Sequence, residues 1–341
     1  MHLNGPSADR AEKLISVAAL CLAIELVLFK FLPDVSTAVI QHSQSALASY
    51  VEFQREYLTA GSVHHARFLG NYILYDLARL LGLLDHSEDP RLHPLRIAAG
   101  ILTPCYAYLG AHFVLADSRQ LEWRYFFATY GLATVIGLYV FYPADAPSLA
   151  FSSMALFFLL EERLATALVL MFVTGLFRES AFHMVWLIAL WAWCDSSRPA
   201  RARLAWVAAF ACVFVAEYVA VRHFFPGPVS SAGGLILDPR RLFLDKGLLS
   251  LTTICSVGLA ALFPIACLVK LRAAGGANDW RFRFFELNCY VFPGWLVFYR
   301  MMNGNLSEFR MLFPALLPCM YGIAYGARRL RSCNATVTAA L

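Results

Sequence analysis

The sequence predicts an all-α, polytopic membrane protein with about ten transmembrane helices. Of its 341 residues, 60% are hydrophobic and only 15% are charged, which departs strongly from the composition of a soluble chain. Long apolar stretches, many of them near the roughly twenty residues that a helix needs to cross a bilayer, are separated by short arginine-bearing turns. In a membrane protein, arginine-bearing turns indicate which side of the membrane a loop lies on, so we interpret the net charge of +5 as a sign of orientation. Nothing in the sequence indicates a nucleic-acid partner.

A first span is expected over residues 14–32, and the sequence then changes character over residues 33–96. This second segment is half polar, is too long for a simple loop, and carries apolar residues at helical spacing. It is therefore predicted to form external, amphipathic juxtamembrane helices. Residues 68–84 within it are apolar enough to span, but Asp76 and Arg79 would then be buried together, one turn apart.

The arginine-bearing turns decide this ambiguity. If all of them are cytoplasmic, the spans alternate without conflict only when residues 33–96 lie wholly outside and both termini lie inside. The chain then forms a single transmembrane domain over residues 1–341. The remaining spans are expected near residues 97–117, 125–142, 148–160, 164–177, 179–194, 204–221, 247–270, 286–302 and 312–327.

The unexplained charges of the apolar region fall on the predicted outer face. Asp145 lies between two prolines in PADAP, the sequence Arg178-Glu179-Ser180 interrupts another apolar stretch, and a later turn ends at Arg310. Charge at bilayer depth costs several kcal/mol unless it faces a cavity, a partner or the interface, so these residues are candidates for a site. The alternative interpretation is that both segments are turns between membrane helices.

At this point the sequence resembles the GT-C superfamily of polyprenyl-phosphate-sugar glycosyltransferases, in particular the bacterial lipid and protein O-glycosyltransferases. The stretch ARFLGNYILYDLARLLGLLDHSEDPRLHPLR is similar to the amphipathic segment ahead of that family's second span, and PADAPSLAFSSMALFFLLEERLATALVLMFVTGLFRES is similar to its third-to-fifth-span region. The likeness covers about the first 200 residues. The chain departs from the family in two respects: a single Asp34 replaces an acidic pair, and the large external C-terminal domain of the larger members is missing.

The resemblance implies transfer of a sugar from a polyprenyl phosphate to a lipid, glycan or protein acceptor, in a bacterial inner membrane. Such a displacement needs one carboxylate to take the acceptor proton and cations to stabilise the departing phosphate. Asp34, directly after the first span, is the predicted base, with Asp145 as its supporter; a helix cap and a turn residue are the respective alternatives. Arginine suits the phosphate because its planar fork donates two parallel hydrogen bonds. The predicted substrate-binding residues are Arg67, Arg96, Arg178, Glu179, Glu308 and Arg310.

No metal site is predicted, although some family members use a divalent cation. His64 and His65 have no carboxylate at ligand-like spacing, and the nine cysteines show no paired spacing, so most of them are expected to be small buried residues. Besides a scaffold or assembly subunit, two other functions stay open. One is a polysaccharide polymerase of the O-antigen type. The other is a lipid or solute transporter, which the carboxylates Glu25 and Glu217 inside predicted spans would suit.

Overall fold

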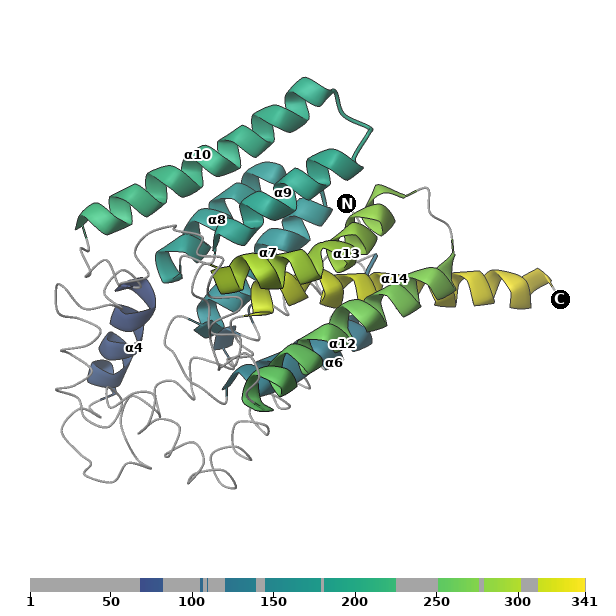
Figure 1. The fold of residues 1–341 in the computed structure, drawn as a ribbon, viewed down its shortest axis with the longest axis horizontal. Helices are drawn as coiled ribbons and strands as arrows, with labels where there is room; N and C mark the ends of the chain where they lie inside the picture. Colours follow the sequence, from purple (N-terminus) through teal and green to yellow (C-terminus); the bar gives the residue numbers. More distant parts are fainter. Residues whose placement is uncertain are drawn as a thin grey trace, which may run out of the picture.

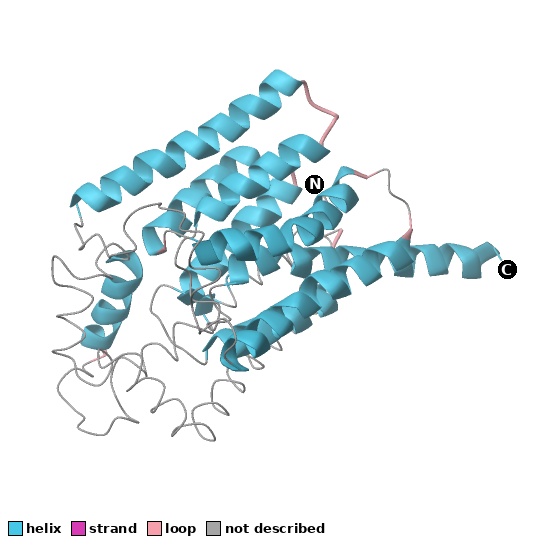
Figure 2. Cartoon of the chain, viewed as in Figure 1, coloured by secondary structure: helices cyan, strands magenta, loops and turns pink. Residues whose placement is uncertain are grey.

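The structure is a computed structural model that describes residues 68–81, 105–106, 109, 120–138, 145–178, 181–224, 251–275, 279–301 and 312–340. Within these ranges every regular element is a helix (Figure 2), as the sequence predicts. The helices are α4 (Phe68–Leu80), α6 (Trp123–Leu138), α7 (Asp145–Leu160), α8 (Leu164–Phe177), α9 (Phe182–Cys194), α10 (Ala200–Phe224), α12 (Leu251–Ala274), α13 (Trp280–Met301) and α14 (Phe313–Ala340).

Helices α7 and α14 form the interior of the bundle. Residues 154–160 of α7 are all buried, as are residues 315–327 of α14, which fits helices that are apolar on every face. Tyr321 ties the two together, because its hydroxyl donates to the carbonyl of Ser153 over 2.7 Å and lies 3.0 Å from the Ser153 hydroxyl. The hydroxyl of Tyr321 is thus satisfied within an otherwise apolar core.

Helix α14 packs closely against α12 through small residues. A Cβ atom placed on Gly322 would overlap the Cys267 thiol, and one on Gly326 would lie 3.0 Å from the backbone of Lys270. Gly322 and Gly326 are four residues apart on one face of α14, the spacing that lets membrane helices approach to backbone contact. The two helices therefore form a tightly packed pair.

Helices α10 and α12 lie along opposite sides of the bundle (Figure 1). They are the two helices, among the described residues, that are long and apolar enough to cross a membrane. Both expose large apolar side chains: Val215, Val219 and Phe224 on α10, and Ile254, Leu262 and Val269 on α12. Exposed aliphatic surface on opposite sides is suited to lipid, so these helices support an association with a membrane.

The observed helix boundaries correct four predictions. The helix expected at residues 204–221 is longer at both ends, because α10 runs from Ala200 to Phe224. The span expected at residues 148–160 begins earlier, at Asp145, so the predicted proline-bounded turn is wrong at that residue. The span expected at 286–302 begins at Trp280. Helix α14 continues to Ala340, well beyond residue 327, and projects from the bundle (Figure 1).

Helix α4 is a short helix inside the segment predicted to lie on the membrane surface. It has 13 residues, which is too short to cross a bilayer. Asp76 and Arg79 are both exposed, so the joint burial that a span would require is not observed. The external position of residues 33–96 stays a prediction, because most of that segment lies outside the described residues.

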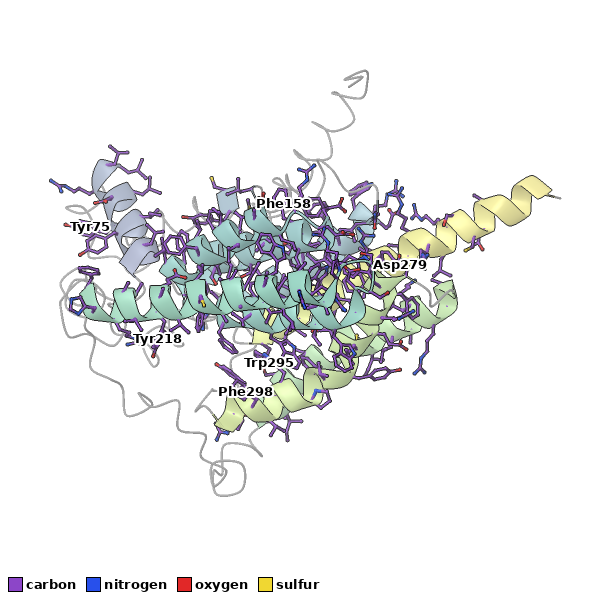
Figure 3. The ribbon with its side chains drawn as sticks, turned by 90° about the horizontal axis from the view of Figure 1, so that it is seen from above. Tyr75, Phe158, Tyr218, Asp279, Trp295 and Phe298 are labelled. Atoms are coloured by element: carbon purple, nitrogen blue, oxygen red, sulfur yellow. The ribbon has the colours of Figure 1, made fainter. Side chains whose placement is uncertain are left out.

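Five of the arginine-bearing segments meet at one end of the bundle, called here the arginine-rich end. Arg281 donates to the carbonyl of Leu160 over 2.8 and 3.1 Å, and Arg198 pairs with Glu162 at 3.0 Å. Further contacts join the other segments: Glu122 N–H to the Ala324 carbonyl, Arg331 to Glu122, and both Arg329 and Tyr325 to Asp279. Figure 3 labels Asp279 at this end, far from Tyr75 of α4.

Candidate functional site

The candidate site lies at the opposite end of the bundle, where α7 begins and α8 ends. Asp145 occupies the first turn of α7 and Arg178 directly follows α8, with its backbone N–H donating to the Thr174 carbonyl over 2.9 Å. Each charge complements its own helix, since carboxylates are favoured at helix N-termini and cations at C-termini. The local sequence therefore places each side chain at the helix end that favours its charge, independently of the contact between the two.

Asp145 and Arg178 form a hydrogen-bonded ion pair. Only 12% of the aspartate side chain and 7% of the arginine side chain are exposed. A pair this buried is sensitive to the loss of either partner, because the remaining buried charge would lose this ionic contact. The pair fastens the start of α7 to the end of α8, 33 residues apart in sequence.

Two serines lie beside this pair and line the same small cavity. Ser148 and Ser152 stand one turn apart on α7, and both are buried. The cavity is completed by Leu149, Phe313, Pro314 and Leu317 and measures about 20 Å³, enough for about one water molecule. The described walls therefore offer phosphate-binding chemistry, a guanidinium with two hydroxyls, in a space too small for a sugar.

A second cavity adjoins the first at Pro314. It lies between α9, α13 and the start of α14, and its walls include His183, Asn288, Trp186 and Trp295. His183 is almost completely buried in the first turn of α9. Figure 3 labels Trp295 and Phe298 on α13, whose last turns approach this end of the bundle. The site is thus polar on the α7 and α8 side and aromatic on the α13 side.

The structure brings together two of the eight predicted site residues, Asp145 and Arg178. The other six lie outside the described residues: Asp34, Arg67, Arg96, Glu179, Glu308 and Arg310. His64 and His65 also lie outside them. Among the described residues, no group of three or more His, Cys, Asp or Glu side chains is arranged to hold a metal ion.

Sequence reasoning missed Ser148, Ser152 and His183. The serines stand three and seven residues after Asp145, so helical spacing places them on its face once the helix is known to begin there. His183 follows Arg178 by five residues and lies in an apolar stretch. A single polar side chain within a predicted membrane span is the feature that could have identified it as a site residue.

A second polar group, Glu217 of α10, is buried in contact with α8. Its side chain is 6% exposed, and neither carboxylate oxygen has a hydrogen-bond partner among the described residues. The carboxylate lies directly against Gly175, where any Cβ atom would overlap it. Glycine at this position therefore makes the room that the carboxylate occupies.

Of the four cysteines that α9, α12, α13 and α14 bury, three are close neighbours. Cys289 and Cys319 have their sulfur atoms 3.9 Å apart, and Asn288 donates to Cys319 over 3.6 Å. The expectation of small buried residues holds for Cys194, Cys267 and Cys319, but Cys105, Cys212 and Cys255 are exposed. Cys212 and Cys255 are exposed because they lie on the outward faces of α10 and α12.

Comparison of the sequence and structure with protein-family models, curated proteins and solved structures gives no match in any of the three.

Proposed function

We propose that this chain is a membrane glycosyltransferase that moves a sugar from a polyprenyl-phosphate donor to a lipid, glycan or protein acceptor at the outer face of the membrane. About ten helices cross the membrane in this proposal, with both termini in the cytoplasm. The observation that carries it is the buried Asp145–Arg178 pair beside two serines, at the end of the bundle opposite the gathered arginines. A buried charged pair within an apolar bundle is typical of a site that handles a charged substrate.

The described residues suit the phosphate half of the reaction. As the bond between the sugar and the phosphate breaks, negative charge collects on the phosphate, and the Arg178 guanidinium and the Ser148 hydroxyl are donors for it. Asp145 orients the guanidinium through their ion pair. The acceptor oxygen forms the new bond to the sugar, and its proton goes to a carboxylate, for which Asp34 is proposed. A phosphate leaves as a stable anion, so no general acid is needed.

The small volume of the cavity gives the proposal a specific consequence. A donor phosphate that binds Arg178 must either break the Asp145–Arg178 pair or share the guanidinium with Asp145. The reason is that the described walls leave room for only about one water molecule. Arginine has five N–H donors, so one side chain can hold a carboxylate and a phosphate together. Lysine offers only a point charge and no fork.

The test is transfer by the purified full-length chain in lipid vesicles. A panel of polyprenyl-phosphate hexoses and pentoses is supplied with an extract of membrane acceptors, and released polyprenyl phosphate is quantified. We expect release by the wild type, loss of most of it in Arg178→Lys, and no change in Arg201→Lys, an exposed arginine at the other end. Full activity of a well-expressed Arg178→Lys variant would make Arg178 a helix-end anchor. Failure of the wild type with every donor would overturn the proposal.

One observation favours transport as a second candidate function. Glu217 is a buried carboxylate without a described hydrogen-bond partner on one of the two apolar, span-length helices, and such residues mark ion and proton pathways in membranes. Uptake into vesicles that depends on Glu217, together with absence of glycosyl transfer, would replace the first proposal with this one. The polysaccharide polymerase differs from the first proposal in its donor, and a lipid-linked oligosaccharide in the same panel distinguishes the two.

A further inference from the structure

An open groove lies at the arginine-rich end, between the end of α9 and the first turns of α13. Its walls are Trp193 and Cys194 of α9, and Arg283, Glu286, Leu287 and Tyr290 of α13. The groove measures about 270 Å³, close to the lower limit of roughly 300 Å³ for small-molecule sites. It is therefore large enough for a small organic group and much too large for a single ion.

The polar wall of this groove carries both signs of charge. Arg283 and Glu286 are three residues apart on α13, which places them on one helical face with their Cβ atoms about 5–6 Å apart. Arg283 is exposed to solvent and Glu286 is half-buried. A ligand that contacts both residues can present an anionic group to Arg283 and a cationic group to Glu286.

The carboxylate of Glu286 is held in place by a hydrogen-bonded relay. Arg272 of α12 donates to the Tyr290 hydroxyl over 3.0 Å, and that hydroxyl donates to a Glu286 oxygen over 3.1 Å. The relay engages Oε1 of Glu286, so the ligand has Oε2 to bind. A pre-positioned carboxylate costs less conformational entropy when a ligand binds.

The remaining walls are apolar and suit the border between water and lipid. Trp193 is 81% exposed and Tyr290 is 51% exposed, and both residue types are enriched where membrane helices meet the lipid headgroups. Leu287 and the Trp193 ring continue the groove as an apolar surface. The ligand therefore has a polar head and an apolar continuation.

We propose that this groove binds a phospholipid with a phosphoethanolamine headgroup, its phosphate at Arg283 and its primary ammonium at Glu286. The phosphate is an acceptor suited to the Arg283 guanidinium, and the primary ammonium is a donor suited to the Glu286 carboxylate. A choline headgroup carries no N–H to donate to Glu286, and a glycerol headgroup carries no cation. The groove therefore favours phosphoethanolamine over phosphocholine and phosphoglycerol headgroups.

This lipid site is separate from the proposed glycosyl-transfer site. Helix α9 has 13 residues and is about 20 Å long; its first turn adjoins Arg178, and its last residues line the groove. The inference rests on the chain lying in a membrane and does not depend on sugar transfer. Loss of either activity can be observed without loss of the other.

Native mass spectrometry of the full-length chain in detergent tests the inference. The protein is titrated with phosphatidylethanolamine, phosphatidylcholine and phosphatidylglycerol of identical acyl chains. We expect one saturable phosphatidylethanolamine molecule, bound at least tenfold more tightly than the other two. Equal or tighter binding of phosphatidylglycerol would overturn the inference, because a cationic patch alone would then explain the site.

Three variants locate the binding. Arg283→Gln should weaken phosphatidylethanolamine binding at least tenfold, whereas Glu286→Gln should keep phosphate binding but abolish the preference over phosphatidylcholine. Arg201→Gln, at an exposed arginine of the same end that does not line the groove, is the matched control and should bind normally. Wild-type binding by Arg283→Gln would refute the assignment. If that variant is misfolded by gel filtration, Trp193→Ala, at a highly exposed wall residue, replaces it and should also weaken binding.

A competition experiment distinguishes a membrane lipid from a soluble compound with the same headgroup. Water-soluble glycerophosphoethanolamine contains the phosphate and the ammonium but has no acyl chains. It should displace the lipid only at a concentration at least a hundredfold higher, because the wall of Trp193 and Leu287 binds the lipid portion. Displacement at equal concentration would show that the groove binds a soluble metabolite and would overturn the lipid assignment.

Discussion

At the scale of single residues, Arg178 and Asp145 have roles in stability that can be separated from any role in catalysis. Both side chains are nearly buried and paired, so each is the counter-ion of the other. Removing one charge from a buried pair typically costs roughly 3–5 kcal/mol, whereas removing both costs much less.

The first prediction uses this asymmetry. Asp145→Asn should lower the free energy of unfolding by about 3 kcal/mol, because the buried Arg178 loses the charge of the carboxylate with which it pairs. Asp145→Asn combined with Arg178→Gln should regain most of that loss. Thermal unfolding of the three proteins in one detergent gives the comparison. A double variant that is as unstable as the sum of the two single variants would mean that the pair contributes nothing as a pair.

The second prediction concerns Asp34, the proposed base, which lies outside the described residues. Asp34→Asn keeps shape and hydrogen bonding but removes basicity, so turnover should fall roughly 10²- to 10⁴-fold. Binding of the donor lipid should be nearly unchanged, since proton removal contributes only in the transition state. Asp145→Asn should reduce turnover less. Normal turnover in Asp34→Asn together with an inactive Asp145→Asn would mean that Asp145 is the base and Asp34 its supporter.

At the scale of elements, close helix contacts are concentrated where glycine removes the side chain. Gly326 of α14 faces the backbone of Lys270, whereas a Cβ atom placed on Gly294 of α13 would meet no heavy atom within 4 Å. The two positions differ in packing, although both are glycines inside helices.

The third prediction compares these two glycines. Gly326→Ala should destabilise the fold by about 1–3 kcal/mol, because α12 and α14 must move apart. Gly294→Ala should be neutral or stabilising by up to about 1 kcal/mol, since alanine is the better helix former. Unfolding curves recorded under identical conditions provide the measurement. Equal effects of the two substitutions on the free energy of unfolding would show that the close α12–α14 contact at Gly326 does not determine stability.

Elements also show how far the sequence predicts the fold. The apolar stretch predicts both ends of α8, because the positions of Leu164 and Phe177 follow directly from charged neighbours. The start of α7 was missed because two prolines suggested a turn, yet proline is tolerated in the first turn of a helix. The extension of α14 to Ala340 was missed because polar residues 328–340 leave the bundle, so hydropathy does not detect them.

The candidate site was predictable only in part for a similar reason. A charge in an apolar stretch identified Arg178 and Asp145, but their pairing depends on α7 and α8 folding back on each other at Glu162, whose φ is 60°. The contact of Glu217 with Gly175 depends on how α10 packs on α8, and nothing local in the sequence reports it.

At the scale of the whole molecule, the two ends of the bundle differ in charge. Segments with many arginines meet around Asp279, Glu122 and Glu162 at one end, and the Asp145–Arg178 pair lies at the other. If the bundle crosses a membrane, the positive-inside rule places the arginine-rich end in the cytoplasm.

The fourth prediction tests this orientation. In a cysteine-free background, Ser43→Cys should react with an impermeant thiol reagent in intact cells, and Ser196→Cys should react only after lysis. Ser196 is exposed at the arginine-rich end, between α9 and α10, so a lack of labelling in intact cells would reflect the membrane and not burial. Labelling of Ser196→Cys alone would reverse the topology and move the proposed site to the cytoplasmic side.

Helix α14 also connects the two ends mechanically. Phe313 at its start lines the cavity beside Arg178, while Ala324 and Arg331 further along bind Glu122 at the arginine-rich end. These contacts lie on one continuous helix and span roughly 27 Å at 1.5 Å per residue. Between these contacts α14 contains Pro318, and its far part contacts Glu122 and Asp279. A molecule that enlarges the cavity is therefore expected to displace the same helix that carries the contacts at the arginine-rich end.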